Sequence, residues 1–453
     1  MNVRLSRRRF LQSAPLLAAP LILPGSAFGQ GKRPPPSGRI QFGVIGCGTI
    51  ALDTLGNFLN NERVQVTAVC DVNRDSGHYG YKGEKQGGRE AGRRMVESHY
   101  AAAAASGAYK GCATYEDFRE MLDNAKLDAV MVCTPDHWHA LMAIRAAAKG
   151  IHTFGQKPLA LTVAEGRRMV EAVTRSGITW QTGSQQRSMI YFRTACEYVR
   201  NGRIGRLQEV RVTLPAGHRD FNQMGARKAP EPVPDGLNYD LWEGPAAHRD
   251  YRPALLPLNW RHNYDYSGGM ITDWGAHHLD IVQWALDKDT SGPVALENIT
   301  HNAPDAGELF NTPTTFSFDV VYEGGLRVHT RNGEEDGVEF IGEGGRSIFV
   351  NRDKLVMKPE DLRRDKIRDD EVRLYASNDH YANFIDGILG QKPTAAPIEA
   401  AHRTITIAHL ANIAIRLGRT SLKWDPVAES VLGDEAADAL LARPMRAPWK
   451  LDG

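Results

Sequence analysis

The chain has 453 residues, of which 42% are hydrophobic and 24% are charged. These values are typical of a globular protein with room for two domains, and they exclude a disordered chain, a collagen-like chain and a small disulfide-stapled domain. Lysine and arginine (55) nearly balance aspartate and glutamate (54), so the overall charge gives no reason to expect a nucleic acid or an anionic membrane as partner.

Residues 1–29 have the pattern of an export signal. They contain Ser6-Arg7-Arg8-Arg9-Phe10-Leu11, which matches the twin-arginine pattern S-R-R-x-F-L at every fixed position. An apolar stretch over 14–23 follows, too short for a permanent membrane anchor, and then small residues that suit a signal peptidase near residues 27–29. We therefore expect a periplasmic protein that is exported folded and has no membrane anchor. The proline-rich residues 30–38 would form a short extended arm.

Residues 39–186 alternate between predicted strands and helices, which is typical of an α/β Rossmann dinucleotide-binding domain. The strand over 40–45 leads into a G-x-G-x-x-A turn, Gly46 to Ala51, and then a helix. The first glycine of such a turn permits the bend, and the second lets the backbone approach a pyrophosphate. The helix N-terminus offers free N–H groups to the phosphates. The turn therefore supplies the first predicted cofactor ligands, Gly46, Gly48, Thr49 and Ile50.

The next strand, over 64–70, ends at Asp71, about 20 residues after the glycine turn, where a carboxylate receives the ribose hydroxyls of a dinucleotide. Asp71 would repel a 2′-phosphate, which favours NAD, while the nearby Arg74 leaves NADP open as an alternative. Residues 72–111 contain an alanine-rich run, and we interpret them as a surface helix insertion without chemistry.

Three further strands, over 127–133, 151–154 and 178–182, end in polar loops. Ligands of doubly wound sheets lie at the carboxyl ends of the strands. We therefore expect these loops to face the cofactor with Thr134, Pro135, His137, Gln156 and Gln185.

A metal site is not expected. The histidines at 137 and 139 have no third ligand close in sequence, and the five cysteines lack C-x-x-C spacing. We interpret the cysteines as buried small residues.

The glycine turn, the T-P-x-x-x-H loop from Thr134 and the Lys157-Pro158 pair together resemble the glucose-fructose oxidoreductase, inositol dehydrogenase and MocA family. Gly268 to His277 resembles the G-G-x-x-x-D-x-G-x-H signature of that family, and the resemblance runs from about residue 40 to 425. The family usually has E-K-P where this chain has Gln156, and the change removes a charge partner of Lys157.

The resemblance implies a second domain over 187–453, of α+β class, with an open and mostly antiparallel sheet. One face of that sheet would carry the substrate site, and the other often forms a subunit interface, so we expect a homo-oligomer, either a dimer or a tetramer. The sequence agrees in broad terms, because four segments have strand character: 207–214, 314–321, 326–331 and 338–341.

The predicted catalytic residues are Lys157, Asp273 and His277. Oxidation of an alcohol needs a base for the hydroxyl proton, and the unperturbed pKa of histidine suits that task. Asp273 is four residues before His277, on the same helix face, and would bind a neighbouring hydroxyl or hold the imidazole; Asp280 is a second candidate to orient it. Lys157 resembles the catalytic lysine of the family and would hydrogen-bond the reacting hydroxyl.

Further polar and aromatic residues are candidates for a polyol pocket, in which aromatic faces meet sugar C–H groups. The predicted substrate-binding residues are Arg187, Trp260, Arg261, Tyr266 and His278. Asn259, His262, Tyr239 and Trp242 are additional candidates for the same wall.

These observations predict an exported oxidoreductase that uses NAD, with NADP as the alternative, on a hydroxyl of a sugar or polyol. Export in the folded state suits a tightly bound cofactor. Two other functions stay open. One is an NAD-dependent, redox-neutral glycoside hydrolase on the same fold, and the other is a non-catalytic sugar-binding or regulatory protein.

Overall fold

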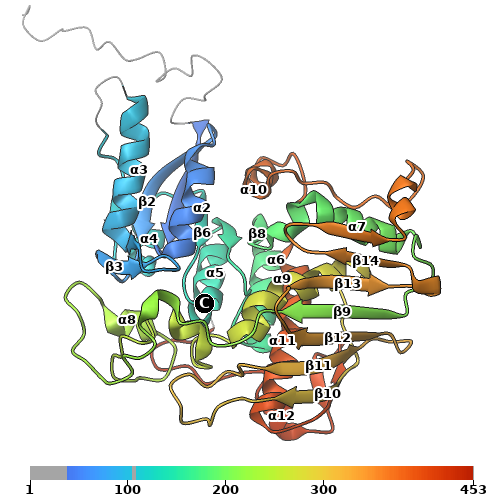
Figure 1. The fold of residues 1–453 in the computed structure, drawn as a ribbon. Coiled ribbons are helices and arrows are strands. Elements are labelled where there is room, and N and C mark those ends of the chain that lie inside the picture. Colours follow the sequence, from blue (N-terminus) through green and yellow to red (C-terminus); the bar gives the residue numbers. More distant parts are fainter. Residues whose placement is uncertain (1–37, 105–108, 452–453) are drawn as a thin grey trace, which may run out of the picture.

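The computed structural model describes residues 38–104 and 109–451, which form two lobes that share one long interface (Figure 1). The expected signal peptide and nearly all of the expected proline-rich arm lie outside these residues. No helix within the two described ranges is long and apolar enough to cross a membrane.

The first lobe contains a six-stranded parallel sheet in the order β5-β2-β1-β6-β7-β8. β1 lies in the middle, and its last residue, Ile45, is in register with the last residues of β2 and β6, Cys70 and Val132. The sheet therefore presents several strand ends along one edge. Its strands are β1 (Ile40–Ile45), β2 (Val64–Cys70), β5 (Ala113–Tyr115), β6 (Ala129–Val132), β7 (His152–Gly155) and β8 (Trp180–Thr182).

Helices cover both faces of this sheet, which explains why its strands are continuous apolar runs rather than alternating ones. They are α2 (Thr49–Leu59), α3 (Arg89–Ala103), α4 (Phe118–Asn124), α5 (His139–Ala148) and α6 (Val163–Ser176), with the 3-10 turns η3 (Asp136–Trp138) and η4 (Gln185–Ser188). The expected insertion after β2 does contain a helix, α3. It also contains a hairpin that the sequence did not indicate, β3 (Ser76–Tyr79) and β4 (Lys85–Gly87).

The second lobe is built on a nine-stranded sheet in the order β15-β14-β13-β9-β12-β11-β10-β16-β17. All neighbouring strands are antiparallel except β9 and β12. Helices α7, α9 and α11 pack on one face, and residues alternate along the strands between that buried face and a polar one. The predicted fold class, a Rossmann domain followed by an α+β domain with an open antiparallel sheet, is confirmed.

The strands of this sheet include the four segments that the sequence predicted, which are β9, β11, β12 and β13. Their bounds are β9 (Glu209–Leu214), β10 (Ala295–His301), β11 (Phe316–Val321), β12 (Arg327–Asn332), β13 (Gly337–Ile341), β14 (Ser347–Val350), β15 (Leu355–Lys358), β16 (Leu422–Asp425) and β17 (Ser430–Leu432). The helices are α7 (Ile190–Arg200), α8 (Tyr239–Glu243), α9 (Gly269–Ala285), α10 (His380–Ile388), α11 (Ile398–Arg416) and α12 (Glu435–Ala439), with the 3-10 turns η5 (Phe221–Gln223), η6 (Asn259–His262), η7 (Glu343–Gly345) and η8 (Glu360–Arg364).

Two late segments of the chain return to the first lobe. Phe384 of α10 joins the core between α2 and the parallel sheet, where its ring lies 5.8 Å from that of Phe154. Trp449 lies 4.8 Å from the ring of Trp138, and Trp449 and Leu451 pack against a core cluster that includes Leu141 and Met142 of α5. The two lobes are thus not simply successive halves of the sequence, and this double return fixes them against each other.

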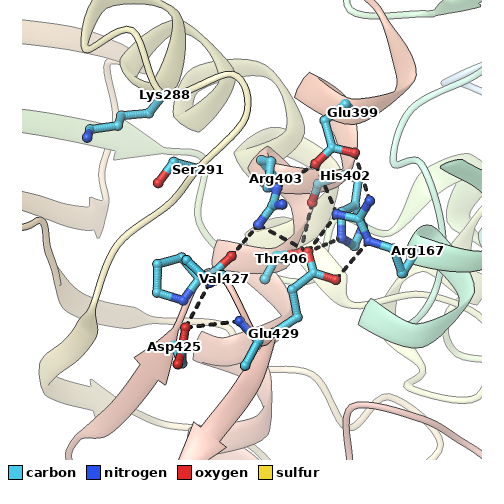
Figure 2. A network of polar contacts seen from close by, with 12 residues as sticks. Arg167, Lys288, Ser291, Glu399, His402, Arg403, Thr406, Asp425, Val427 and Glu429 are labelled. Carbon is cyan, nitrogen blue, oxygen red and sulfur yellow. Dashed lines mark hydrogen bonds and ion pairs between the residues drawn. The ribbon is translucent and has the colours of Figure 1, made fainter.

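A polar network ties α6 of the first lobe to α11 and the β16–β17 turn (Figure 2). The Arg167 guanidinium donates to the carboxylates of Glu399, at 2.8 and 2.9 Å, and of Glu429, at 2.9 and 2.7 Å. Arg403 donates to Glu399 at 2.6 Å, and His402 Nε2 lies 2.7 Å from Glu429. Two guanidinium groups therefore meet two carboxylates, and the charges balance inside the fold.

Candidate active site

A cavity of about 410 Å³ lies between the two lobes, at the carboxyl ends of the parallel strands. The first lobe lines it with residues that follow β1, β2, β6, β7 and β8. The second lobe contributes η6, α9 and the hairpin between β14 and β15. Because one hollow touches both lobes, a ligand held by the first lobe lies against side chains of the second.

The glycine turn after β1 forms one end of the cavity. Gly46 has φ +87°, and a Cβ atom at this position would lie 2.4 Å from the carbonyl oxygen of Cys133, so only glycine fits there. Gly48 is the N-cap of α2 and provides no side-chain cap. The first N–H groups of α2 therefore keep their hydrogen-bonding capacity for a ligand, as an anionic phosphate requires.

Asp71 lies beside this turn, at the end of β2. The Cys47 N–H donates to its Oδ2 at 2.6 Å and the Asn73 N–H to its Oδ1 at 2.8 Å. Burial raises the pKa of Asp71, and these two hydrogen bonds oppose the rise. The backbone thus fixes the carboxylate, whose remaining lone pairs can accept the hydroxyls of a ribose. The glycine turn, the bare helix end and this carboxylate together fit a dinucleotide.

Lys157 and Asp273 meet across the boundary between the lobes. The Lys157 ammonium donates to Asp273 Oδ1 at 2.7 Å and to its main-chain oxygen at 3.0 Å, and Arg261 Nε lies 3.7 Å from the same Oδ1. Burial alone would raise the pKa of Asp273, but the attraction of Lys157 and Arg261 outweighs it and lowers the pKa to about 2. Asp273 is therefore a carboxylate at any ordinary pH.

His277 lies on α9, one turn after Asp273, and faces the same cavity. Burial lowers its pKa well below the usual value, and the positive charges of Lys157 and Arg352 lower it further. Its Nδ1 atom has no hydrogen-bond partner among the described residues. The side chain is consequently a neutral imidazole.

The two predicted ways of orienting His277 are not found. Asp273 is engaged by Lys157, and the Asp280 carboxylate accepts hydrogen bonds from Arg187 at 2.8 Å and from Thr404 at 3.1 Å. Neither carboxylate makes a hydrogen bond to the imidazole in the described structure, where their donors are Lys157, Arg187 and Thr404.

Gln156, which stands where the family usually has glutamate, lines the cavity but is not bonded to Lys157. Its side chain packs against Gly183, where an added Cβ would lie 2.4 Å from Gln156 Oε1. Its Nε2 atom is buried and finds no partner in the described part of the protein. The loss of a carboxylate at this position therefore leaves Lys157 with a charge partner, since Asp273 takes that role.

Most of the predicted ligands line the cavity. Besides Lys157, Asp273 and His277, they are Gly46, Gly48, Thr49, Ile50, Asp71, Thr134, Pro135, Gln156, Gln185, Trp260 and Arg261, together with the additional candidate Trp242.

Arg74, His137 and Tyr266 lie outside the cavity, which corrects their predicted contact with cofactor or substrate. Arg74 is exposed and is held through its backbone N–H by Gly236. His137 is fully buried, its Nε2 lies 3.0 Å from the carbonyl oxygen of Trp242, and its ring packs 5.1 Å from that of Tyr266. His137 and Tyr266 thus belong to an aromatic cluster behind the cavity wall.

Arg187 and His278 were also predicted to bind substrate, and they too lie outside the cavity. The Arg187 guanidinium is 2% exposed and makes paired hydrogen bonds of 2.8 to 2.9 Å with Asp280 and Asp289. His278 is one residue past His277, so it points to another side of α9 and lies 3.0 Å from Asp336. The further candidates that do not line the cavity are Asn259, His262 and Tyr239.

Several cavity residues were not predicted from the sequence. Tyr79 and Tyr81, on the β3–β4 hairpin, line the cavity, so part of residues 72–111, which were interpreted as a surface insertion, belongs to the cavity wall. The flanking Gly80 and Gly83, both with positive φ, were the available signal for a hairpin that turns inward. Arg219 and Arg352 also line the cavity; no local pattern marks them, because contacts between distant segments of the second lobe decide their position.

The described residues contain no group of three or more histidine, cysteine, aspartate or glutamate side chains able to hold a metal. The five cysteines are unpaired, four of them buried and Cys133 partly so.

The parallel sheet with its glycine turn, closed by an open antiparallel sheet that contributes a lysine-paired aspartate and a neutral histidine, defines a two-domain dinucleotide-binding protein. The family description "Oxidoreductase family, NAD-binding Rossmann fold" matches residues 85–184, and "Oxidoreductase family, C-terminal alpha/beta domain" matches residues 192–451. The chain belongs to this family, that of glucose-fructose oxidoreductase, inositol dehydrogenase and MocA, as the sequence motifs predicted.

Individual relatives match over shorter stretches. Myo-inositol 2-dehydrogenase from Thermotoga maritima is 33% identical over 175 residues, which cover 39% of this chain and 41% of the relative. A glycosyl hydrolase family 109 protein from Shewanella pealeana is 26% identical over 192 residues, or 38% of each chain. The chain thus spans about two fifths of the length of these curated relatives.

Among solved structures, the WlbA dehydrogenase from Bordetella pertussis, in complex with NADH and UDP-GlcNAcA, superposes with a TM-score of 0.57. It is 18% identical, and the match covers 85% of this chain and 99% of that one. A likeness at this identity establishes the shared two-domain fold.

Proposed function

We propose that this protein is an NAD-dependent oxidoreductase that oxidises a hydroxyl-bearing carbon of a sugar or polyol. One observation carries the proposal: a glycine turn with a bare helix N-terminus shares its cavity with Lys157, Asp273 and His277. The name of a curated relative, myo-inositol 2-dehydrogenase, supports the same substrate class.

His277 would accept the proton of the substrate hydroxyl. A base must be unprotonated before it acts, and the low pKa of this buried imidazole keeps it neutral. Its Nδ1 atom is buried and has no protein partner among the described residues, so the substrate would meet the other ring nitrogen, Nε2. NAD, when bound, would supply the acceptor for the hydride that leaves the same carbon.

Lys157 would hold the reacting oxygen. An ammonium has three N–H donors, and two of them point to Asp273. The third can hydrogen-bond the hydroxyl, and the positive charge stabilises the alkoxide character that develops as the proton leaves. Asp273 would keep the ammonium in place, because it binds the lysine through both its carboxylate and its main-chain oxygen.

The cofactor end supports NAD over NADP. The first turn of α2 would hold the pyrophosphate, and Asp71 would accept the hydroxyls of the adenosine ribose. Glu116 and Asp117 line the cavity near Asp71, whereas Arg74 does not line it. A 2′-phosphate would therefore meet carboxylates at this end rather than the guanidinium of Arg74.

The β3–β4 hairpin supports slow release of the cofactor. The Gly80 N–H donates to Thr49 Oγ1 at 2.7 Å, which ties the hairpin to the start of α2. A Cβ on Gly48 would lie 3.3 Å from the Tyr79 ring, so that ring covers the glycine turn. Tyr81 reaches across to Phe221 of the second lobe, with ring centroids 5.8 Å apart. Release would require these contacts to open.

We further propose that the protein reaches the periplasm through the twin-arginine route with its cofactor already bound. The support is the sequence Ser6-Arg7-Arg8-Arg9-Phe10-Leu11. Periplasmic and cytoplasmic fractions of cells that express the full chain test this. Replacement of Arg7 and Arg8 by lysine should retain the protein in the cytoplasm, and an unchanged periplasmic fraction would refute the export proposal.

The activity is tested on the full chain purified from its native compartment. Mass spectrometry should find bound NAD, and a panel of sugars and polyols should reduce it, with the rise in near-ultraviolet absorbance that reduced nicotinamide gives. The proposal fails if the protein neither retains nor binds a nicotinamide dinucleotide, or if no member of the panel changes its redox state.

A redox-neutral glycoside hydrolase is the second candidate, favoured by the match to a glycosyl hydrolase family 109 protein. Such an enzyme oxidises a sugar carbon, eliminates the leaving group, adds water and reduces the carbon again, so the cofactor ends unchanged. Cleavage of aryl glycosides without net reduction of NAD would decide for it. If Lys157→Met and His277→Asn variants keep both ligand binding and the cellular phenotype, a non-catalytic sugar-binding protein is the better interpretation.

A further inference from the structure

The catalytic end of the cavity has more positive charge than the fold itself neutralises. Four cationic side chains line the cavity around this end, namely Lys157, Arg219, Arg261 and Arg352. Asp273 is the carboxylate that faces them, and it is shared by Lys157 and Arg261. Asp136 also lines the wall, but it is buried, accepts a hydrogen bond from Ser267 at 2.5 Å, and has a pKa raised by burial.

Arg352 is one of two arginines of this set whose guanidinium has no carboxylate partner in the described structure. It projects from the turn between β14 and β15, and its guanidinium lies 4.8 Å from the centre of the Trp274 ring. No carboxylate in the described structure is within ion-pair distance of it. The nearby Asp336, whose pKa it helps to lower, is already bonded to His278 at 3.0 Å. The charge of Arg352 instead acts on His277 and Tyr81, inside the cavity.

Arg219 and Arg261 extend this positive surface. The guanidinium of Arg219 makes no hydrogen bond or ion pair within the described ranges, although its main-chain oxygen lies 3.0 Å from His262 Nε2. The guanidinium of Arg261 lies over the Trp260 ring at 4.4 Å and donates to a main-chain oxygen at 3.2 Å. Two guanidinium groups on the cavity wall thus lack a protein anion, and a third shares one.

The pyrophosphate of the cofactor does not account for this surface. Its place is the first turn of α2, at the glycine turn, whereas Arg352 belongs to the second lobe and acts on His277. Arg352 is exposed, so solvent accommodates its charge until the other ligand of the cavity enters beside His277 and meets the guanidinium. A planar guanidinium stacked on an aromatic ring keeps its N–H edge free, and that edge matches the two oxygens of a carboxylate.

We propose that the substrate is a sugar acid, a polyhydroxylated carbon chain or ring with a carboxylate, and that Arg352 binds the carboxylate. The inference rests on the proposed function and names its substrate class. In the reaction, the hydride of the oxidised carbon passes to NAD and the hydroxyl proton passes to the protein. The carboxylate is unchanged, and it serves to hold and orient the molecule.

The test compares substrates that differ in charge but share their hydroxyl stereochemistry. The pairs are glucuronate with glucose, galacturonate with galactose, and gluconate with sorbitol, each measured on the NAD-loaded full chain. Glucose 6-phosphate is added to separate a carboxylate site from a phosphate site. In at least one pair, kcat/KM for the acid should exceed that for the neutral partner by about 10-fold or more.

Substitutions in the turn between β14 and β15 then test whether Arg352 causes the preference for the acid. Arg352→Gln should lower kcat/KM for the acid by about 10- to 100-fold, and change the value for its neutral partner by less than about 3-fold. Arg352→Lys keeps the charge but loses the bidentate geometry, so its kcat/KM for the acid should lie between those of the parent and of Arg352→Gln. The matched control is Lys354→Gln on the same turn, where the ammonium is already paired with Glu335 at 2.6 Å and no effect is expected.

Binding is measured alongside turnover, so that the two proposals can fail separately. If calorimetry detects binding of an acid but no pair is turned over, and the binding is lost in Arg352→Gln, the sugar-acid site stands and the oxidoreductase function does not. If neutral sugars react as well as acids, or if Arg352→Gln lowers both alike, the sugar-acid site is wrong and the oxidoreductase stands. Preference for glucose 6-phosphate over every acid, or no binding by any acid, overturns the site as well.

Discussion

The network around Arg167 and the wall around Arg352 are both rich in arginine, yet they treat charge in opposite ways. In the network, Arg167 and Arg403 meet Glu399 and Glu429 at hydrogen-bond distance (Figure 2). On the cavity wall, Arg352 has no carboxylate at ion-pair distance in the described structure, and its guanidinium lies over an aromatic ring instead.

The paired arginines of the network stabilise the fold, whereas the unpaired Arg352 on the cavity wall is available to bind a ligand. A half-buried cation paired on two sides stabilises the elements that supply its partners, here α6, α11 and the β16–β17 turn. An unpaired cation beside a cavity contributes little to the stability of the folded state, but its electrostatic field acts on any ligand that enters the cavity. Substitutions in the first group should therefore cost stability, and substitutions in the second should cost activity.

The largest expected effect is that of His277→Asn. The amide has nearly the shape of the imidazole but cannot serve as a base at ordinary pH, so kcat should fall about 10³-fold. Thermal unfolding should change little and the variant should still bind NAD, because His277 has no Nδ1 partner to lose among the described residues. Steady-state kinetics, calorimetry and the amount of retained NAD measure the three properties.

An exposed histidine on β10, His301, provides the control, and His301→Asn should match the parent in all three measurements. An undiminished kcat in His277→Asn would remove this residue from the chemistry.

Arg167→Ala should show the reverse pattern. It leaves Glu399 and Glu429 with fewer cationic partners, and it should lower the free energy of unfolding by about 2 kcal/mol, less than for a fully buried pair because the site is partly solvated. Denaturant unfolding of the NAD-free and NAD-loaded protein measures the loss, while kcat should remain within about 2-fold.

The neighbouring Arg168→Ala is the matched control, since its ion pair with Glu171 spans one turn of α6 on the surface, where such pairs contribute little. Equal destabilisation by both changes would show that the network is no more than surface charge.

Asp71 is an intermediate case, because its negative charge is held by backbone N–H groups rather than by a cation. Asp71→Asn should weaken NAD binding by about 10-fold, since an uncharged amide accepts hydrogen bonds from ribose less strongly. NADP binding should weaken less, because the repulsion of its 2′-phosphate falls at the same time. Titration with both cofactors gives the ratio of their affinities.

The ratio of the NAD and NADP affinities is the decisive quantity, because a substitution that only distorted the backbone around Asp71 would weaken the binding of both cofactors equally. Asp75→Asn offers the comparison: this carboxylate pairs with Arg94 at 2.8 Å and does not line the cavity.

A smaller effect is expected for Tyr81→Ala, an uncharged member of the cavity wall. The change removes the ring contact with Phe221, and such a contact is worth about 1 kcal/mol, which corresponds to about 5-fold faster release of NAD. Displacement of bound NAD by excess labelled NAD measures the rate. Tyr191→Ala alters a comparably exposed tyrosine on α7, and should leave that rate unaltered.

The sequence predicted the first lobe and the catalytic trio better than it predicted the substrate wall, and the reason is physical. β1 and β2 were predicted to the residue, because buried parallel strands are continuous apolar runs bounded by glycine and aspartate. Lys157 and His277 lie in motifs whose spacing is local. Arg187 and His278 were misplaced because a polar residue beside such a motif looks the same whether it faces a cavity or a buried aspartate.

Arg352 and Tyr81 are cavity residues that could not be predicted from the sequence. Each reaches the cavity from a hairpin, and the place of a hairpin depends on pairing and packing between distant segments. No short-range pattern encodes that placement. Arg219 was missed for the same reason.

The smallest expected effect concerns the pH dependence of kcat, which we expect to be absent near neutral pH. A base with a lowered pKa loses its proton at lower pH, so the fall in kcat on acidification should shift below the usual range of histidine. The profile should be flat from about pH 6 to about pH 8. Burial is the main cause of the low pKa of His277, and Lys157, Arg352, His278 and His380 add to it in that order.

Arg352→Gln should therefore move the acid limb of the profile upward by less than about one pH unit, because burial remains and only one cation is lost. The stopped-flow rate of NAD reduction, taken as a function of pH for the parent and Arg352→Gln, measures both limbs with a neutral sugar as substrate. An acid limb near the ordinary pKa of histidine in the parent would mean that the field of the cavity wall does not reach the base. The distinction between paired and unpaired arginines would then concern ligand binding alone.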